Sequence, residues 1–187
     1  DELIGVYQTT GNDEILMASS EGKCIRFNEK AVRSMGRDTM GVKSISISGD
    51  DRVVDMAIIR EGEEQEVFTI SENGYGKRSD VSEYKIQNRN GKGMKAGIFN
   101  EKTGRLVGLK QVTENEDVMI IANNGVILRT PANSISKITR DTIGVKVMRL
   151  QENSRVSCVA IADTIAEDIT GETNEEPIVI DEPIVSE

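Results

Sequence analysis

Glycines and basic residues recur along the chain in a pattern suited to binding phosphate groups. Five positions hold one residue type in three copies, separated by 52 and then 51 residues. They are Gly22, Gly74 and Gly125; Arg26, Arg78 and Arg129; Arg37, Arg89 and Arg140; Gly41, Gly93 and Gly144; and Lys43, Lys95 and Lys146. Glycine lets the backbone turn tightly and approach a ligand closely, and arginine and lysine neutralise phosphates. So regular a spacing predicts a repeat architecture with one cationic turn in each unit.

Three turns of the form Arg-x-x-x-Gly-x-Lys carry the clearest copies of this pattern. They are Arg37 to Lys43, Arg89 to Lys95 and Arg140 to Lys146. If each turn lies on the same edge of its unit, the cations form a periodic track that suits the phosphates of a bent duplex. The alternative is that the glycines only form tight turns and the arginines only form surface ion pairs. Asp38 and Asp141, which directly follow two of the arginines, keep this alternative open.

A second basic set lies in the predicted hairpins, where ordinary solvated strand positions would explain some of its members. Together the two sets predict contacts with duplex DNA at Lys23, Arg26, Arg33, Arg37, Lys43, Lys77, Arg78, Arg89, Lys92, Lys95, Arg129, Lys137, Arg140 and Lys146. The chain has only three tyrosines, three phenylalanines and no tryptophan. Proteins that bind single strands use aromatic stacking platforms, so this composition favours a duplex held by its backbone.

The chain has few residues suited to catalysis or metal binding. It contains no histidine, which is the commonest general base and a common metal ligand. Cys24 and Cys158 stand alone without metal-ligand spacing, and we expect both to be buried or half-buried in a reducing compartment. Gly91-x-Gly93-x-x-Ala96 precedes a predicted strand rather than a helix, so it is not a dinucleotide-binding motif. We therefore expect no catalytic residue, no metal site and no cofactor in this chain.

The charges divide the chain into a neutral body and an acidic tail. The formal net charge is −9. Residues 163–187 contain nine acidic residues and no lysine or arginine, so residues 1–162 balance 23 acidic against 23 basic residues. The tail lacks aromatics and is expected to be disordered. A neutral body can still present a basic face where its charges segregate, so net charge does not exclude nucleic acid as a partner.

Short β-rich segments around glycine turns must position the cations. In the middle unit, Val67 to Ser71 and Tyr75 to Arg78 flank Asn73-Gly74, which is a strong hairpin signal because both turn positions tolerate positive φ. A polar connection, the cationic turn and two further strands follow each hairpin. We predict the third strands at Val42 to Ile47, Met94 to Phe99 and Val145 to Leu150, and the fourth at Val53 to Ile59, Leu106 to Val112 and Val156 to Ala162.

Four short strands in each unit of roughly 50 residues indicate an all-β, propeller-like fold. The predicted units cover residues 11–59, 60–112 and 113–162 of a body at residues 1–162, and residues 163–187 form the tail. Leu3 to Gln8 resembles a strand left over from a preceding unit. Complete propellers usually have more than three blades, so we expect a fragment or an open arc. Helix is nearly absent, with one turn at most in Glu29 to Ser34.

Four stretches, taken in order, carry a more specific signal. They are Gly22 to Asn28, Met35 to Val42, Glu72 to Arg78 and Thr139 to Val145. Together they resemble the C-terminal domain family of bacterial DNA gyrase A over residues 1–162. The resemblance implies a β-pinwheel, a six-bladed propeller variant whose blades exchange strands and whose basic outer rim bends DNA. The family's box, Gln-Arg-Arg-Gly-Gly-Lys-Gly, is present as a degenerate copy at Gln87, Arg89, Gly91, Lys92 and Gly93, with Asn88 and Asn90 departing from it.

The resemblance also implies partners and a role. The module would wrap duplex DNA without sequence specificity and support ATP-dependent negative supercoiling by a type II topoisomerase. Its partners would be the rest of gyrase A together with gyrase B in a heterotetramer, with ATP and Mg acting on other parts. With no signal peptide or bilayer-spanning apolar run in the sequence, we expect a cytoplasmic, nucleoid-associated protein with no membrane partner. The alternatives are the equivalent domain of topoisomerase IV, which decatenates, and a protein-binding propeller scaffold.

Overall fold

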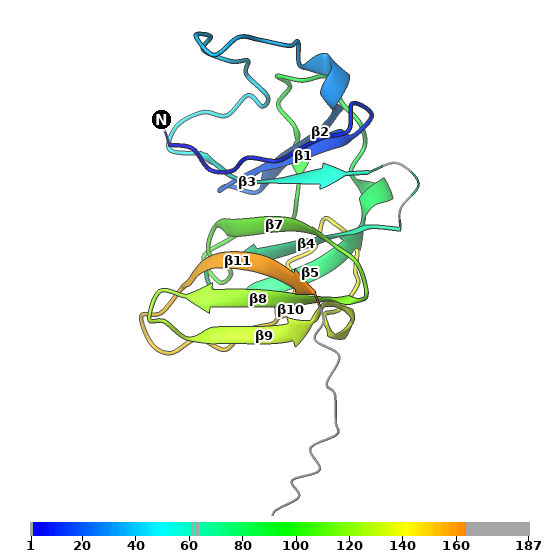
Figure 1. The fold of residues 1–187 in the computed structure, drawn as a ribbon. Coiled ribbons are helices and arrows are strands. Elements are labelled where there is room, and N and C mark those ends of the chain that lie inside the picture. Colours follow the sequence, from blue (N-terminus) through cyan, green and yellow to red (C-terminus); the bar gives the residue numbers. More distant parts are fainter. Residues whose placement is uncertain (1, 61, 63, 164–187) are drawn as a thin grey trace, which may run out of the picture.

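The structure is a computed structural model that describes residues 2–60, 62 and 64–163. The predicted disordered tail lies outside the described residues, apart from Asp163. The described chain forms three antiparallel sheets, with the first unit at the top of Figure 1 and the third at the bottom. Its helices are three short 3-10 turns, and no helix in the described part is long and apolar enough to cross a membrane. The all-β prediction is confirmed.

The elements follow one another in the same order in each unit. The strands are β1 (Glu14–Ser19), β2 (Lys23–Asn28), β3 (Val53–Ile59), β4 (Glu66–Ser71), β5 (Tyr75–Asp80), β6 (Met94–Lys95), β7 (Leu106–Val112), β8 (Glu116–Ala122), β9 (Ile127–Pro131), β10 (Val145–Lys146) and β11 (Val156–Asp163). The 3-10 helices are η1 (Glu29–Ala31), η2 (Val81–Glu83) and η3 (Ala132–Ser134). Each 3-10 helix directly follows the second strand of a hairpin, which agrees with the single turn predicted after Asn28.

Each sheet is built around a hairpin that turns at a repeated glycine. The hairpins are β1–β2, β4–β5 and β8–β9. Their turns contain Gly22, Gly74 and Gly125, which have φ values of 80°, 77° and 84°. These values lie in the left-handed region that glycine enters without steric penalty. The constant spacing of the first repeated glycine therefore reflects one hairpin turn in each unit.

Two apolar clusters hold neighbouring sheets together. The first joins Leu16 and Ala57 of the first sheet to Leu106 of the second. The second joins Phe68 of the second sheet to Ile120 of the third. All five side chains are buried, and full burial of a large aliphatic or aromatic side chain stabilises a fold by about 1.5–3 kcal/mol. The sheets thus cover one another's faces, and their strand edges lie toward the surface.

The first two sheets are each completed by a short strand from the following unit. Their strand orders are β3-β1-β2-β6 and β10-β5-β4-β7. In the first sheet, β6 pairs with β2 through Lys23 opposite Lys95. In the second, β10 pairs with β5 through Tyr75 opposite Lys146. Strand exchange between units, which the resemblance implied, is present in this chain. The third sheet has the order β11-β8-β9, and among the described residues no strand pairs with the outer edge of β9.

The exchanged strands are shorter than the sequence predicted. The segments expected to be strands at Met94 to Phe99 and Val145 to Leu150 form strands only over their first two residues. The equivalent segment, Val42 to Ile47, forms no strand, and its Ile45 makes one isolated parallel bridge to Gly91. Leu3 to Gln8 is irregular as well. A strand at these positions needs the edge of a preceding sheet, and no such edge lies beside either segment in the described chain.

The second repeated glycine is required where the exchanged strand meets its acceptor. Gly93 and Gly144 have φ values of 71° and 90°. A Cβ atom at Gly93 would lie 2.5 Å from the carbonyl oxygen of Cys24, and one at Gly144 would lie 2.7 Å from that of Gly76. Both distances are shorter than side chains tolerate, so glycine here permits the close backbone approach that strand exchange needs.

Candidate nucleic-acid interface

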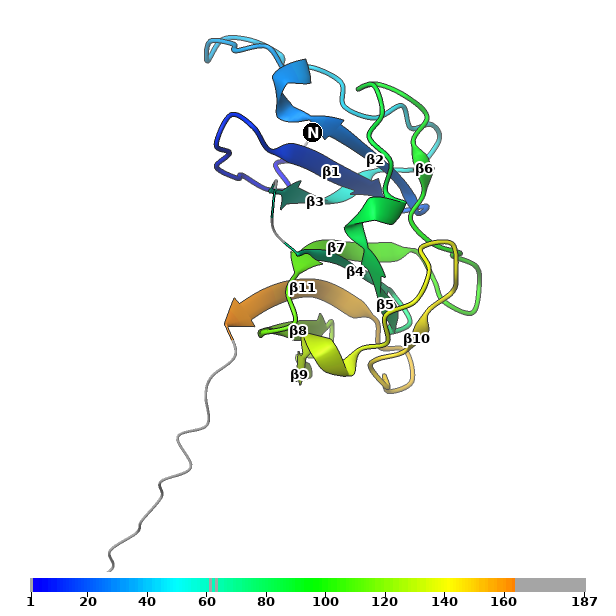
Figure 2. The same ribbon diagram turned by 90° about the vertical axis from the view of Figure 1, so that its right-hand side faces the viewer.

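Strand exchange brings repeated lysines to one edge of the molecule. Figure 2 shows β6 and β10 on the same side, one above the other. Lys95 on β6 and Lys146 on β10 are both exposed. Lys23, which faces Lys95 across the strand pair, is half-buried, and its amine lies 4.0 Å from the Asp51 carboxylate. The predicted track therefore has a physical origin, because each exchanged strand ends with a lysine on the outer edge of the preceding sheet.

The cationic turns extend this edge beyond the paired strands. The Ser46 amide donates to the Gly91 carbonyl at 2.8 Å, and the Asn90 amide donates to Ser44 at 2.6 Å. These contacts place the first and second turns side by side, where Lys43 and Lys92 are both exposed. We call the surface formed by Lys43, Lys92, Lys95 and Lys146 the exchange edge.

An aromatic ring holds two cations at this edge. The Lys146 amine lies 4.3 Å from the centre of the Tyr75 ring and donates to the Asn73 carbonyl at 2.9 Å. The Lys102 amine lies 5.5 Å from the same ring. A cation over an aromatic face is attracted by the ring quadrupole. Lys102 was missed by the repeat pattern because the equivalent positions of the other two units hold Asp50 and Asn153, so sequence periodicity gave no signal for it.

The loop of the first unit carries two of the predicted residues in exposed positions. Arg33 and Arg37 both lie in the segment that follows η1. Neither side chain makes a hydrogen bond or ion pair with any other residue that the structure describes. They are therefore accessible to an anionic ligand, although the loop is not part of a sheet.

Lys77 and Arg78 are buried, which corrects two of the predicted DNA contacts. Lys77 is 2% exposed, and its amine donates to the carbonyls of Thr139, Arg140 and Thr142 beneath the third cationic turn. Burial lowers the pKa of Lys77 from 10.5 to about 8. Its hydrogen bonds tie β5 to the turn, and a phosphate cannot reach its amine.

The first repeated arginine forms an ion pair inside each unit, and its side chain is largely buried in the first two units. Its partner is the acidic residue twelve positions earlier, so Arg26 pairs with Glu14 at 2.5 Å and Arg129 pairs with Asp117 at 2.7 Å. Arg78 pairs with Glu66 in the same way, and both residues are buried. The pairing neutralises the charge that the sequence assigned to phosphate contacts at these three positions.

Two of these arginines also reach into the following unit. The Arg26 guanidinium donates to the carbonyls of Val81 and Tyr84, at 2.8 and 3.0 Å, at the two ends of η2. Arg78 donates in the same way to Asn133 and Ile135, at 3.1 and 2.9 Å, around η3. The acid–arginine pair therefore joins each unit to the 3-10 helix of the next, and its role is structural.

The second repeated arginine fastens each cationic turn to the unit before it. Arg89 donates to the carbonyls of Lys43 and Ala31, and Arg140 donates to those of Lys95 and Glu83. Both side chains belong to half-buried residues. These two arginines therefore serve the fold, but through backbone carbonyl oxygens and not through the surface ion pairs of the alternative.

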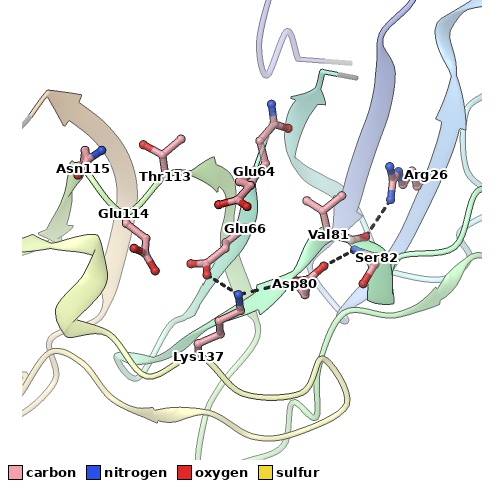
Figure 3. A pocket seen from close by; sticks show the side chains of 11 residues that line it. Arg26, Glu64, Glu66, Asp80, Val81, Ser82, Thr113, Glu114, Asn115 and Lys137 are labelled. Atoms are coloured by element: carbon pink, nitrogen blue, oxygen red, sulfur yellow. Dashed lines mark hydrogen bonds and ion pairs between the residues drawn. The ribbon is translucent and has the colours of Figure 1, made fainter. Parts of the chain in front are cut away.

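Lys137 lies in an acidic cleft and not on the exchange edge. Figure 3 shows its amine between Glu66 and Asp80, at 2.8 and 3.7 Å, with Glu64 and Glu114 on the same cleft. Hydrogen bonding to Glu66 raises the pKa of Lys137 above its usual value. A cleft with this charge repels phosphate, so the predicted DNA contact at Lys137 is corrected.

Most residues of the degenerate box form contacts between the second unit and the first. The Gln87 backbone amide donates to the Arg26 carbonyl at 2.7 Å, the Gly91 carbonyl accepts from the Ser46 amide, and Gly93 makes the close approach to Cys24 described above. Lys92 is the box residue with an exposed charge. The described residues contain no cluster of histidine, cysteine or carboxylate side chains that could hold a metal ion. Cys24 is buried as expected, whereas Cys158 is exposed on β11, contrary to the prediction.

Comparison with known proteins gives concordant matches. The family model described as DNA gyrase C-terminal domain, beta-propeller, matches residues 13–60, 65–113 and 116–162. DNA gyrase A of Staphylococcus epidermidis is 44% identical over 160 residues, which cover 86% of this chain and 18% of the relative. DNA gyrase A of Staphylococcus aureus is 41% identical over 176 residues, covering 94% and 20%. The chain thus spans about a fifth of the length of these relatives.

Two solved structures have a similar fold. The DNA gyrase A C-terminal domain superposes with a TM-score of 0.76 and 26% identity, covering 82% of this chain and 52% of that chain. The C-terminal domain of DNA topoisomerase IV superposes with a TM-score of 0.77 and 19% identity, covering 82% and 47%. At 19% identity, the second likeness is one of fold alone.

Proposed function

Since the chain belongs to the DNA gyrase C-terminal domain family of beta-propellers, we propose that it binds duplex DNA through its exchange edge, without sequence specificity. The observation that carries the proposal is the recurrence of exposed lysines where strands are exchanged. Contacts with phosphates supply affinity and carry no sequence information. Arg33 and Arg37 are two further exposed cations in the first unit, on the loop that follows η1.

We expect a duplex that follows the exchange edge from unit to unit to be bent, as the family's propeller-like fold implies. Bending a duplex has a free-energy cost, which is offset only where contacts continue along the curve. Lys95 and Lys146 occupy the same position on successive exchanged strands, so contacts recur from one sheet to the next. The aromatic contact of Tyr75 with Lys146 fixes one of these cations before DNA arrives.

We propose further that the bound duplex is presented to a type II topoisomerase core that introduces negative supercoils. In this role the chain works with the rest of gyrase A and with gyrase B in a heterotetramer, in the cytoplasm and at the nucleoid. ATP and Mg act on those other parts, and this chain binds DNA without cofactor or catalysis of its own. The identity of 41–44% to gyrase A proteins favours gyrase over topoisomerase IV as the parent enzyme.

Salt-dependent affinity for plain duplexes of unrelated sequence tests the proposal. Fluorescence anisotropy should give similar association constants for all of them. In each case the logarithm of the association constant should fall linearly with the logarithm of the salt concentration. Lys95→Ala and Lys146→Ala should each reduce the slope by about 0.9 if each lysine neutralises one phosphate. Arg60→Ala, which removes an exposed cation beyond β3, is the matched control and should leave the slope unchanged.

The same measurements separate DNA binding from a protein-binding scaffold. A scaffold would show weak affinity for every duplex and equal slopes for the wild-type chain and the lysine variants. That result would overturn the proposal. A strong preference for one sequence would also contradict it, because phosphate contacts cannot discriminate bases.

A further inference from the structure

A further arginine recurs in each unit, at the start of the fourth strand. Arg52, Arg105 and Arg155 are separated by 53 and then 50 residues, and they directly precede β3, β7 and β11. All three are exposed. Their steps differ from the 52 and 51 residues of the other repeated positions, so the recurrence becomes visible only when the strands themselves are aligned.

Two hydrogen bonds hold the backbone of each of these arginines against the hairpin of its unit. One residue of the hairpin donates its amide to the arginine carbonyl and accepts the arginine amide through its side chain. These hairpin residues share one repeat position and are Ser20, Glu72 and Asn123. In chain order, the bonds to the carbonyl measure 2.8, 2.9 and 2.9 Å, and the return bonds measure 3.4, 2.9 and 3.0 Å. The same reciprocal pair thus fixes each arginine backbone and leaves its guanidinium outside the pair.

The three guanidinium groups remain accessible to a ligand. The side chains of Arg52 and Arg105 make no hydrogen bond or ion pair with any residue that the structure describes. The Arg155 guanidinium lies 3.9 Å from the Glu72 carboxylate, and 66% of that arginine side chain is exposed. Arginine presents its donors in a planar fork that binds carboxylates and phosphates through paired hydrogen bonds. We call Arg52, Arg105 and Arg155 the arginine row.

Hydrogen bonds between units set the spacing of the arginine row. The Leu106 amide donates to the Ser20 carbonyl at 2.9 Å, so Ser20 lies between Arg52 and Arg105, and the equivalent bond between the second and third units measures 2.8 Å. Two strand spacings of about 4.8 Å therefore separate successive arginines, which gives about 10 Å. Every contact that sets this spacing is made among the three described units. The three side chains border one hollow, at the left of Figure 1, where β3 and β11 begin.

The arginine row lies on the opposite side of each sheet from the exchange edge. In the first sheet, β3 and β6 are the two outermost strands, and in the second sheet these are β7 and β10. Three strand spacings, or about 14 Å, separate the outermost strands of a four-stranded sheet. A duplex held by the exchange edge therefore contacts a different surface.

Exposed carboxylates alternate with the arginine row at this end of the sheets. They lie in the hairpin and in the loops before the fourth strands, at Glu21, Asp50, Glu101 and Glu152. Duplex DNA carries one negative charge per about 1.7 Å of its axis, so it would bring phosphates against these carboxylates as well as against the arginines. A protein surface can match interspersed charges, and arginine is enriched in protein interfaces. The charge pattern therefore favours a protein partner with separated carboxylates.

We propose that the arginine row is a docking site for an acidic α-helix of a partner protein. A helix rises 1.5 Å per residue, so carboxylates seven residues apart lie on one face and about 10.5 Å from each other. This distance matches the spacing of successive arginines. Residues on one face of an extended strand recur at multiples of about 6.7 Å, which does not match. The inference does not rest on DNA binding, because no residue of the exchange edge takes part in it.

Binding of synthetic helices to the full chain tests the proposal. The probe is a fluorescein-labelled, alanine-rich helical peptide with a glutamate at every seventh position, and its control has the same composition with glutamates five residues apart, on different faces. Fluorescence anisotropy should show saturable binding of the probe, about tenfold tighter than that of the control peptide. The triple variant Arg52→Gln/Arg105→Gln/Arg155→Gln should weaken probe binding by about tenfold, because it removes three exposed charge pairs. Arg60→Gln removes an exposed cation at the other end of β3 and should leave the affinity unchanged.

DNA binding by the same variants separates this site from the exchange edge. The triple variant should keep the wild-type salt slope for duplex DNA, and Lys95→Ala/Lys146→Ala should keep the wild-type affinity for the probe. Equal binding of the two peptides, no binding of either, or full probe affinity in the triple variant would overturn the inference. A salt slope reduced by about 0.9 for each arginine would assign the row to phosphates and refute it as well. A chain that binds the probe but no duplex would contradict the proposed function alone.

Discussion

The three acid–arginine pairs provide a graded test of whether these repeated arginines support the fold. The side chain of Arg78 is 6% exposed, that of Arg26 is 14% exposed, and that of Arg129 is 34% exposed. Replacing each by methionine removes the guanidinium and keeps most of the apolar stem. If the arginines join units, the loss of stability should follow burial and not position along the chain.

The magnitudes follow from the cost of leaving a buried charge without its partner. Removing one member of a buried ion pair lowers the free energy of unfolding by about 3–5 kcal/mol, whereas an exposed pair contributes about 0–1 kcal/mol. We expect Arg78→Met at or below the lower end of the first range. Glu66 is buried and two carbonyls lose a donor, but the Lys137 amine remains 2.8 Å from the Glu66 carboxylate and still neutralises part of its charge. Arg129→Met should cost less than Arg78→Met, because the Arg129 side chain is 34% exposed and solvent screens its charge, and Arg26→Met should lie between them.

Urea unfolding followed by circular dichroism at neutral pH measures these differences. The double variant Glu66→Gln/Arg78→Met should recover part of the loss, because it no longer buries a carboxylate that Lys137 alone has to neutralise. At a temperature where Arg78→Met remains folded, its DNA affinity should keep the wild-type salt slope. Equal destabilisation by Arg78→Met and Arg129→Met, or a reduced salt slope in Arg78→Met, would falsify the structural role.

Three further outcomes are expected. In thermal unfolding, Gly93→Ala should lower the melting temperature more than Gly41→Ala does. The reason is that a Cβ at Gly93 meets the Cys24 carbonyl, whereas one at Gly41 has no heavy atom within 4 Å. Equal effects of the two substitutions would contradict the close approach at Gly93. Between pH 8 and 10.5 the unfolded chain binds more protons at Lys77 than the folded chain does, since burial holds the folded pKa at about 8, so this group's contribution to stability rises with pH. Urea midpoints over that range should therefore rise less in Lys77→Met than in the wild type, and an equal rise would refute this role. Cys158 should react with a thiol reagent in the native chain while Cys24 does not, because burial raises the pKa of Cys24 to about 12; modification of both at similar rates would contradict the packing of β2.

The hairpins and their turns could be predicted because their signals are local. Asn73-Gly74 between two β-rich runs specifies its turn through backbone preferences alone, and the structure places the turn there. The sequence also identified the second repeated glycine, but it did not reveal the contact that requires glycine there. Gly93 is needed because a strand from another unit passes the Cys24 carbonyl, and such a contact across about 70 residues has no local signature.

The arginines show where the prediction from sequence was incomplete. Their spacing revealed that they belong to a repeat, but the same spacing results from phosphate contacts and from contacts between units. The acidic residue twelve positions before Arg26, Arg78 and Arg129 was the available signal, because it recurs with the same period. Among the repeated lysines of the exchange edge, Lys43 and Lys146 have Ala31 and Ser134 twelve positions earlier, so no acidic residue recurs at that spacing. These lysines are the cations that the structure exposes.

Strand exchange also means that each sheet can be completed only some time after its hairpin has been synthesised. The β1–β2 hairpin is complete once Asn28 has been made, but its outer edge remains uncovered until β6 and the Ala96 amide follow. At about 5–20 residues per second, a ribosome needs several seconds to cover that interval. During this time each nascent hairpin presents an open edge, and a chain released early would leave its last hairpin in that condition. The polar and charged residues of β2 at Lys23, Arg26 and Asn28 would oppose pairing between neighbouring nascent chains until β6 pairs with the open edge of β2.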